Sequence, residues 1–116
     1  MQLSKDAMLL RIFVGEQEKC GHQPLYEAIV MKAREMHLAG ATVLRGPLGY
    51  GRTSRLHAAK MLRLSTDLSV VVEIVDTEDR IDAFLVALDG MIGNGLVTTE
   101  RVQVRRYGKP DGPSEP

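Results

Sequence analysis

The sequence contains no tryptophan, and aromatic residues make up only 4% of its 116 positions. A hydrophobic core must therefore be built from aliphatic side chains and methionine. The single cysteine, Cys20, cannot form a disulfide within the chain, which favours a reducing compartment. No apolar run approaches the roughly 20 residues needed to cross a bilayer, and the first residues lack the hydrophobic segment of a signal peptide. We therefore expect a cytoplasmic protein.

The chain also lacks an excess of charge of either sign. Fifteen basic residues balance fifteen acidic residues, whereas a general nucleic-acid-binding protein is usually basic. Nucleic acid is therefore not an expected partner. The hydrophobic fraction of the sequence is 44%, and its length is typical of one domain. A chain of this size can bury roughly 65% of its unfolded surface, which is enough for one core without metal or disulfide support.

The first part of the chain has the pattern of a strand, a helix and a second strand. The run Met8–Val14 is apolar and ends at Gly15, as in a short buried strand. Pro24 stands where a helix can start, because its missing N–H group is not needed at the first helical position. Gly40 is the predicted C′ residue of that helix, and a second strand begins with residues 41–44. The apolar stripe of the helix consists of Leu25, Ala28, Ile29, Ala33 and Met36.

The second part repeats this order. Val70–Val75 is β-branched almost throughout, as expected of a strand with both faces largely covered. Asp76 or Thr77 caps the helix that follows. The segment Gly93-Asn94-Gly95 breaks this helix, and Leu96–Tyr107 returns as the last strand. The apolar stripe of the second helix consists of Ile81, Phe84, Leu85, Leu88 and Ile92.

This order of elements is that of an α+β, ferredoxin-like βαββαβ fold. Right-handed crossovers place both helices on one face of a four-stranded antiparallel sheet. The other face is too apolar to be left in water, and no third helix is available to cover it, so we expect the chain to self-associate. We expect one domain over residues 1–107 and a flexible C-terminal tail over residues 108–116, which holds three of the five prolines.

Basic residues gather in the middle of the chain. No acidic residue lies between Glu35 and Asp67, whereas five arginines and lysines do. Residues 45–55 include three glycines, whose backbone N–H groups can approach an anion, and three arginines, which can bind it bidentately. This combination suits a phosphate. The alternative is that the glycines turn a hairpin and the arginines are merely solvated.

Four segments of the sequence have a familiar pattern: Leu10–Glu16, Pro24–Val30, Gly40–Gly46 and Val71–Asp76. Together they make the chain similar to the PII-like signalling proteins, and within them to the branch called Domain of Unknown Function 190. The resemblance covers residues 9–107 and implies a homotrimer of ferredoxin-like subunits whose sheets pack inward. It also implies small-molecule sites in the clefts between subunits and a flexible T-loop between the second and third strands.

The resemblance also implies where a ligand would bind. Gly49-Tyr50-Gly51-Arg52 resembles the Gly-Phe-Gly-Arg start of the T-loop, whose backbone approaches nucleotide phosphates. Gly93-Asn94-Gly95 resembles the Gly-Asp-Gly of the phosphate-side B-loop, and Arg105 and Arg106 lie near the C-terminal arginines that complete the cleft. The candidate ligand-binding residues are Arg45, Gly46, Gly49, Tyr50, Gly51, Arg52, Gly93, Asn94, Gly95, Arg105 and Arg106.

Two departures from the family pattern affect the expected ligand. Leu96 stands where the B-loop of nitrogen-regulatory members continues with lysine, so a triphosphate should gain little over a mono- or diphosphate. Tyr50 occupies the aromatic place at the loop base and not that of the modified tyrosine, so uridylylation is not implied.

We therefore expect a bacterial regulatory protein that binds a small anionic effector such as an adenine nucleotide. The T-loop would act on a target protein, such as a membrane transporter or an enzyme, and no resident cofactor is expected. The alternative is a trimeric metal- or stress-responsive protein of the copper-tolerance type, which shares the fold.

Other candidate chemistry is weaker. Cys20 and His22 lie two residues apart and could provide half of a metal site, but no further ligand stands at a suitable spacing, so no metal site is predicted. Ser54 and His57 lack the third group that would orient a base. An acylphosphatase-like hydrolase would need an arginine-bearing glycine loop after the first strand, which this chain lacks. Because no nucleophile, base and oxyanion donor can be assembled, we predict that the protein is not an enzyme.

Overall fold

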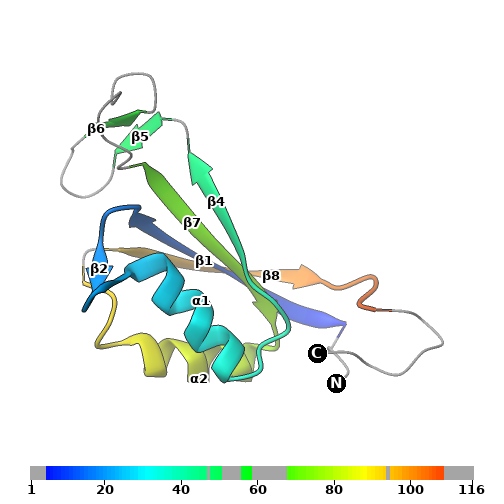
Figure 1. Ribbon diagram of the computed structural model, residues 1–116. Helices are drawn as coiled ribbons and strands as arrows, with labels where there is room; N and C mark the ends of the chain where they lie inside the picture. The colour runs from blue at the N-terminus through cyan, green and yellow to red at the C-terminus, as the bar shows by residue number, and fades with distance from the viewer. Residues whose placement is uncertain (1–4, 47, 51–55, 59–67, 94, 109–116) are drawn as a thin grey trace.

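The fold is known from a computed structural model that describes residues 5–46, 48–50, 56–58, 68–93 and 95–108. Four strands form one antiparallel sheet in the spatial order β4–β7–β1–β8, and two helices cover one of its faces (Figure 1). This arrangement confirms the predicted ferredoxin-like fold. The strands are β1 (Asp6–Gly15), β4 (Thr42–Gly46), β7 (Ser69–Asp76) and β8 (Leu96–Gln103), and the helices are α1 (Leu25–Glu35) and α2 (Glu78–Leu88).

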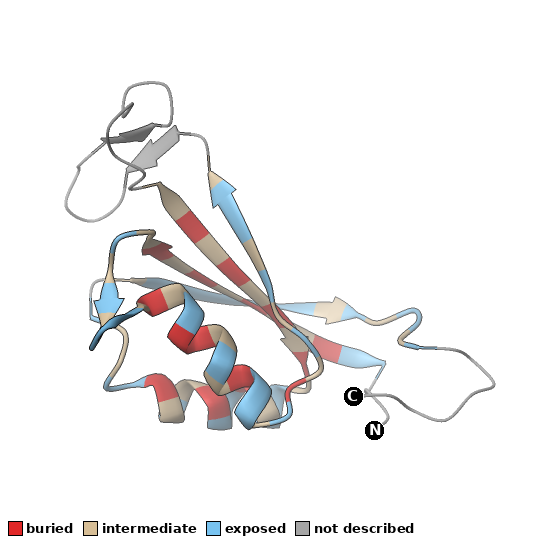
Figure 2. Ribbon diagram, in the orientation of Figure 1, coloured by how far each residue is buried: buried red, intermediate tan, exposed pale blue. Residues whose placement is uncertain are grey.

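The core lies between the helices and the sheet. Every second residue of β7 is buried, and β1 alternates in the same way from Leu10 to Val14. Buried residues of both helices pack against these strands (Figure 2). Phe84 on α2 is the largest fully buried side chain, and aliphatic residues surround it, as the aromatic-poor composition requires. The core cluster consists of Leu10, Ile12, Val14, Leu25, Ile29, Ala33, Leu38, Val70, Val72, Ile74, Ile81, Phe84 and Leu88.

The end of α1 differs from the prediction. The left-handed residue after the helix is His37, with φ of 61°, and not Gly40. The N–H of His37 donates to the carbonyl of Arg34 at 3.1 Å, and the N–H of Leu38 donates to that of Ala33 at 3.0 Å. These two bonds form a Schellman motif, in which Leu38 packs into the core. Packing of Leu38 thus places the left-handed residue three positions before Gly40, and the helix itself ends at Glu35.

Other boundaries shift by a few residues. Pro24 is the N-cap of α1 and precedes its first turn. Thr77 caps α2 by accepting a hydrogen bond from the N–H of Arg80 at 3.4 Å, and α2 ends at Leu88, before the predicted glycine break. Strand β8 ends at Gln103 and does not reach Tyr107.

The structure also contains two short hairpins. The first was not predicted, and the second agrees with the hairpin that the sequence left open as an alternative for residues 45–55. Strands β2 (Lys19–Cys20) and β3 (Gln23–Pro24) pair in the loop before α1, and β5 (Leu48–Tyr50) and β6 (Leu56–Ala58) pair between β4 and β7. Runs of two or three residues are too short to show a periodicity in the sequence. Within the described residues, no helix has the length and apolar character needed to span a membrane.

None of the described elements covers the second face of the sheet, as predicted. Its apolar residues include Leu44 and Leu96, whose exposed fractions are 49% and 59%. Arg11 lies in the middle of this face, where its Nε contacts Glu73 at 2.9 Å and its Nη1 contacts Glu100 at 2.8 Å. Both hydrogen bonds raise the pKa of Arg11, and the bond to Glu73 has the larger effect. The face therefore combines exposed aliphatic side chains with a charge cluster that is internally paired.

Candidate functional site

One end of the sheet gathers the segments that the sequence assigns to ligand binding. Strand β4 ends at Gly46, opposite Ser69 at the start of β7, and Gly15 at the end of β1 is paired with the same Ser69. The chain between β4 and β7 leaves the sheet here, and the β5–β6 hairpin lies beyond it (Figure 1). We call this region the loop end of the sheet.

At the loop end, Arg45 is held by an acidic partner. Its Nη2 lies 2.5 Å from Oε2 of Glu16, which directly follows β1. The side chain of Glu16 is only 10% exposed, whereas that of Arg45 is 56% exposed. The backbone N–H of Glu16 donates to the carbonyl of Leu68 at 2.7 Å, which ties the residue to the chain entering β7. Arg45 is therefore an anchored guanidinium whose charge is already balanced, and not a free cation.

The glycine turn after α2 reaches the same end of the sheet. A Cβ at Gly95 would lie 3.0 Å from Cγ2 of Ile92, 3.1 Å from the carbonyl oxygen of Phe13 and 3.3 Å from Cγ1 of Val14. A side chain at position 95 would therefore be crowded and would force its neighbours to shift, because the turn packs directly on the end of β1. A Cβ at Gly93, in contrast, would meet no atom within 4 Å.

The C-terminal arginines lie elsewhere. Arg105 and Arg106 follow β8, whose eight residues separate them from Gly95. At about 3.3 Å per residue this strand is about 26 Å long. Both arginines are exposed, and Nε of Arg106 donates to the carbonyl of Gly108 at 3.5 Å. A single chain therefore divides the predicted site residues between the two ends of β8.

The remaining predicted residues are placed only in part. The backbone of Gly49 and Tyr50 belongs to β5, where these residues pair with His57 and Leu56. Gly51, Arg52 and Asn94 lie outside the described residues.

Sequence reasoning missed Glu16. The residue ends the segment Leu10–Glu16, which carries the family resemblance, but it was not among the predicted ligand-binding residues. Two features of the sequence could have identified it. Glu16 directly follows a buried strand, and the arginines of the basic segment have no acidic partner within that segment.

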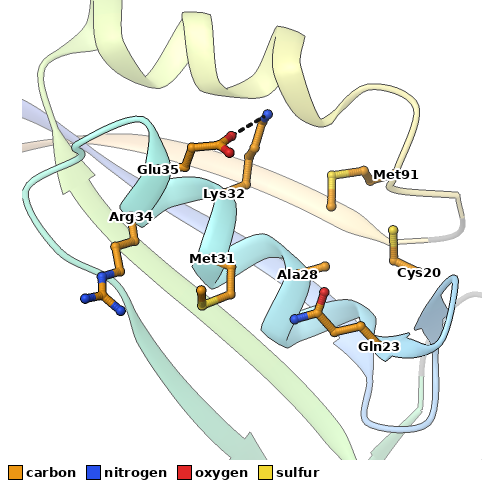
Figure 3. A pocket seen from close by; sticks show the side chains of 8 residues that line it. All are labelled: Cys20, Gln23, Ala28, Met31, Lys32, Arg34, Glu35 and Met91. Carbon is orange, nitrogen blue, oxygen red and sulfur yellow. Dashed lines mark hydrogen bonds and ion pairs between the residues drawn. The ribbon is translucent and has the colours of Figure 1, made fainter.

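A second feature is a groove of about 560 Å³ along α1 (Figure 3). Nζ of Lys32 contacts Oε2 of Glu35 at 2.8 Å, and this hydrogen bond lowers the pKa of Glu35. Cys20 is half-buried with a free thiol, and its neighbour His22 is exposed. In the described part of the chain, no three His, Cys, Asp or Glu side chains come together as metal ligands. The groove is lined by Cys20, Gln23, Ala28, Met31, Lys32, Arg34, Glu35 and Met91.

Comparison with known proteins gives a consistent family and fold. The family DUF190, described as "Uncharacterized ACR, COG1993", matches residues 7–104. A UPF0166 protein of Aquifex aeolicus is 44% identical over 96 residues, which cover 83% of this chain and 90% of that protein. A UPF0166 protein of Methanocaldococcus jannaschii is 34% identical over 92 residues, covering 78% and 84%.

Solved structures extend the likeness in fold. CPII, a nitrogen regulatory PII-like protein from Thiomonas intermedia K12 solved with ADP, AMP and bicarbonate, superposes with a TM-score of 0.68 at 16% identity. The match covers 87% of this chain and 90% of CPII. A protein of Thermus thermophilus described as PII-like superposes with a TM-score of 0.62 at 14% identity, covering 85% and 89%.

Proposed function

The chain belongs to the DUF190 family, and from this premise we propose that it is a non-enzymatic PII-like regulator that binds an adenine nucleotide between the subunits of a homotrimer. One observation carries the proposal. Gly95 at the loop end is separated from Arg105 and Arg106 by the length of β8, about 26 Å. A site that uses both groups therefore needs two chains, with the arginines of one subunit completing the loop end of its neighbour.

The uncovered face of the sheet supports the assembly. Burying aliphatic side chains such as Leu44 and Leu96 against another subunit gains about 25 cal/mol per Å² of apolar surface. Arg11 is hydrogen-bonded to both Glu73 and Glu100, so one positive charge faces two negative charges. A neighbour that covers this face must therefore leave Glu100 in contact with water or supply a cation to it. Light scattering should report about three times the chain mass of 12.8 kDa. A monomer that persists at micromolar concentration would contradict the proposed assembly.

An adenine nucleotide is the first ligand to test, because CPII, which shares the fold, was solved with ADP and AMP. Calorimetric titration of AMP, ADP and ATP should show binding, with little advantage for the triphosphate because Leu96 supplies no charge. Replacing Arg105 and Arg106 by alanine should weaken ADP binding about ten- to a hundredfold, the worth of a hydrogen bond from a guanidinium to phosphate.

The matched control is Arg101→Ala. Arg101 lies on β8 itself, is 74% exposed, and pairs with Glu78, so its loss should leave ADP affinity unchanged. Equal affinities in the double variant and the control would contradict the role of the C-terminal arginines. Titration of copper and zinc into the same preparation tests the alternative of a copper-tolerance protein. Such a protein should bind the metal and should not bind the nucleotide.

We further propose that the ligand acts on the chain between β4 and β7, which would then engage a target protein. Ordering or release of a loop through phosphate contacts is an established mode of switching. The candidate loop residues start directly after the end of β4, so a ligand bound at the loop end would contact the place where that segment leaves the sheet.

A further inference from the structure

The two C-terminal arginines lie between two points of attachment to the folded chain. Before them, the N–H of Val104 donates to the carbonyl of Lys5 at 2.7 Å, which continues the pairing of β8 with β1 by one residue. After them, the phenol hydroxyl of Tyr107 donates to the carbonyl of Ala39 at 2.9 Å. The arginines therefore occupy a span of two residues that is held at both ends.

The second attachment depends on one side chain. Beyond Val104, the segment makes no further backbone–backbone hydrogen bond to a described residue. Tyr107 is half-buried, whereas Arg105 and Arg106 are exposed. The tyrosine thus fixes the segment to the fold and leaves both arginines accessible to a neighbouring subunit.

The turn that receives the tyrosine is itself held in place. Ala39 lies between α1 and β4, and its N–H donates to Oδ2 of Asp76 at 2.9 Å. Asp76 is fully buried, and Leu38, the neighbour of Ala39, belongs to the core cluster. The hydrogen bond from Tyr107 therefore connects the C-terminal segment to a fixed point of the fold.

We propose that Tyr107 is a positioning residue for the nucleotide site, whose hydroxyl holds Arg105 and Arg106 towards the neighbouring subunit before the nucleotide binds. This inference rests on the proposed function and deepens it. Tyr107 acts through the arginines, since its own hydroxyl is engaged by Ala39. A segment that is ordered in advance strengthens binding, because the nucleotide does not have to order it.

Calorimetry with ADP tests this role in a cycle of variants. Tyr107→Phe keeps the ring and removes the hydroxyl, so the segment is in place in only a fraction of the molecules, and the apparent affinity falls by that fraction. We expect ADP to bind Tyr107→Phe about three- to tenfold more weakly than wild type, the range that loss of one neutral hydrogen bond allows. The matched control is Tyr26→Phe, which removes a phenol hydroxyl at the opposite end of α1 from Ala39 and should keep the wild-type affinity.

The cycle is completed in the double variant Arg105→Ala, Arg106→Ala. In that background Tyr107→Phe should cause no further loss of ADP affinity, because the groups that it positions are absent. A general loss of stability or of assembly would weaken binding in both backgrounds. The cycle therefore distinguishes positioning from a merely structural role.

An NMR relaxation measurement without nucleotide tests the same role in the wild-type protein. The backbone order parameters of Arg105 and Arg106 should be close to the value for rigid backbone, about 0.85, and should fall in Tyr107→Phe. Wild-type values below about 0.6 would mean that the segment is not held, and would overturn the proposal without the need for any variant.

The outcomes separate the two proposals. Wild-type protein that binds no ADP would overturn the proposed function, and the role of Tyr107 with it. ADP binding that the double arginine variant leaves unchanged would remove the arginines from the site, and Tyr107 with them. Equal ADP affinity in Tyr107→Phe and wild type, or an equal loss in both backgrounds of the cycle, would overturn the role of Tyr107 alone.

Discussion

Replacing Asp76 should destabilise the fold more than any surface substitution. Its side chain is fully buried at the end of β7, where Oδ2 accepts from the N–H of Ala39 at 2.9 Å and Oδ1 accepts from the N–H of Thr77 at 2.7 Å. Nε of Arg80 lies 3.3 Å from the same Oδ2. The guanidinium of Arg80 in turn donates to the carbonyls of Met36 and His37. One carboxylate thus joins the turn after α1 to the start of α2.

The magnitude follows from these contacts. Asp76→Asn keeps the volume, removes the charge opposite Arg80 and places an NH₂ donor against a backbone N–H. Hydrogen bonds to a charged group are worth about 1.5–3 kcal/mol each and are not additive, so we expect a loss of about 2–4 kcal/mol in the free energy of unfolding. Asp76→Ala also leaves Arg80 without its partner and should cost about 3–5 kcal/mol. Against a typical total of about 5–15 kcal/mol, either change is large.

Urea unfolding followed by far-ultraviolet circular dichroism is the appropriate assay, because the chain has no tryptophan for fluorescence. Protein concentration must be held fixed, since self-association would shift the apparent stability. Asp82→Asn, an exposed carboxylate on α2, is the matched control and should change stability by less than about 0.5 kcal/mol. If Asp76→Asn and Asp82→Asn unfold at the same urea concentration, the joining role of Asp76 is refuted.

The fold could be predicted from the sequence because the main elements have strong and different periodicities. In β7, alternate residues of the β-branched run are buried, and in α2 the buried residues belong to the predicted apolar stripe. The end of α1 could not be predicted in this way. Gly40 is the residue type that usually ends a helix, but burial of Leu38 decides the position and places His37 in the left-handed conformation.

The candidate site was less predictable, because it depends on which strands are neighbours. Glu16 and Arg45 are far apart in sequence, and they meet only because β7 lies between β1 and β4 with its start at their ends. The sequence assigned Arg45 to an anion from its place among the glycines and arginines of residues 45–55, and the contact with Glu16 could not be read from that segment. The same topology separates Gly95 from Arg105 by the length of β8. The family-like motifs alone do not indicate this distance.

Two further changes test local details. The pKa of Glu35 is lowered by its hydrogen bond to Lys32; the pair therefore stabilises the fold above the unfolded pKa, and this contribution is lost as pH falls through the lower folded pKa. NMR titration of Lys32→Ala should show the pKa of Glu35 rising towards its ordinary value, and an unchanged pKa would contradict the pairing. Gly95→Ala should destabilise by about 1–3 kcal/mol, because its Cβ would press on Ile92 at 3.0 Å and on a backbone carbonyl of β1 at 3.1 Å. Gly90→Ala is the control: its Cβ would meet nothing within 4 Å, and the stiffer unfolded chain should leave stability unchanged or raise it by up to about 1 kcal/mol. The melting temperature of Gly95→Ala should therefore fall below that of Gly90→Ala, by about 4–8 °C per kcal/mol for a domain near this size. Equal melting temperatures would mean that the turn yields freely and that close packing on β1 does not hold it at the loop end.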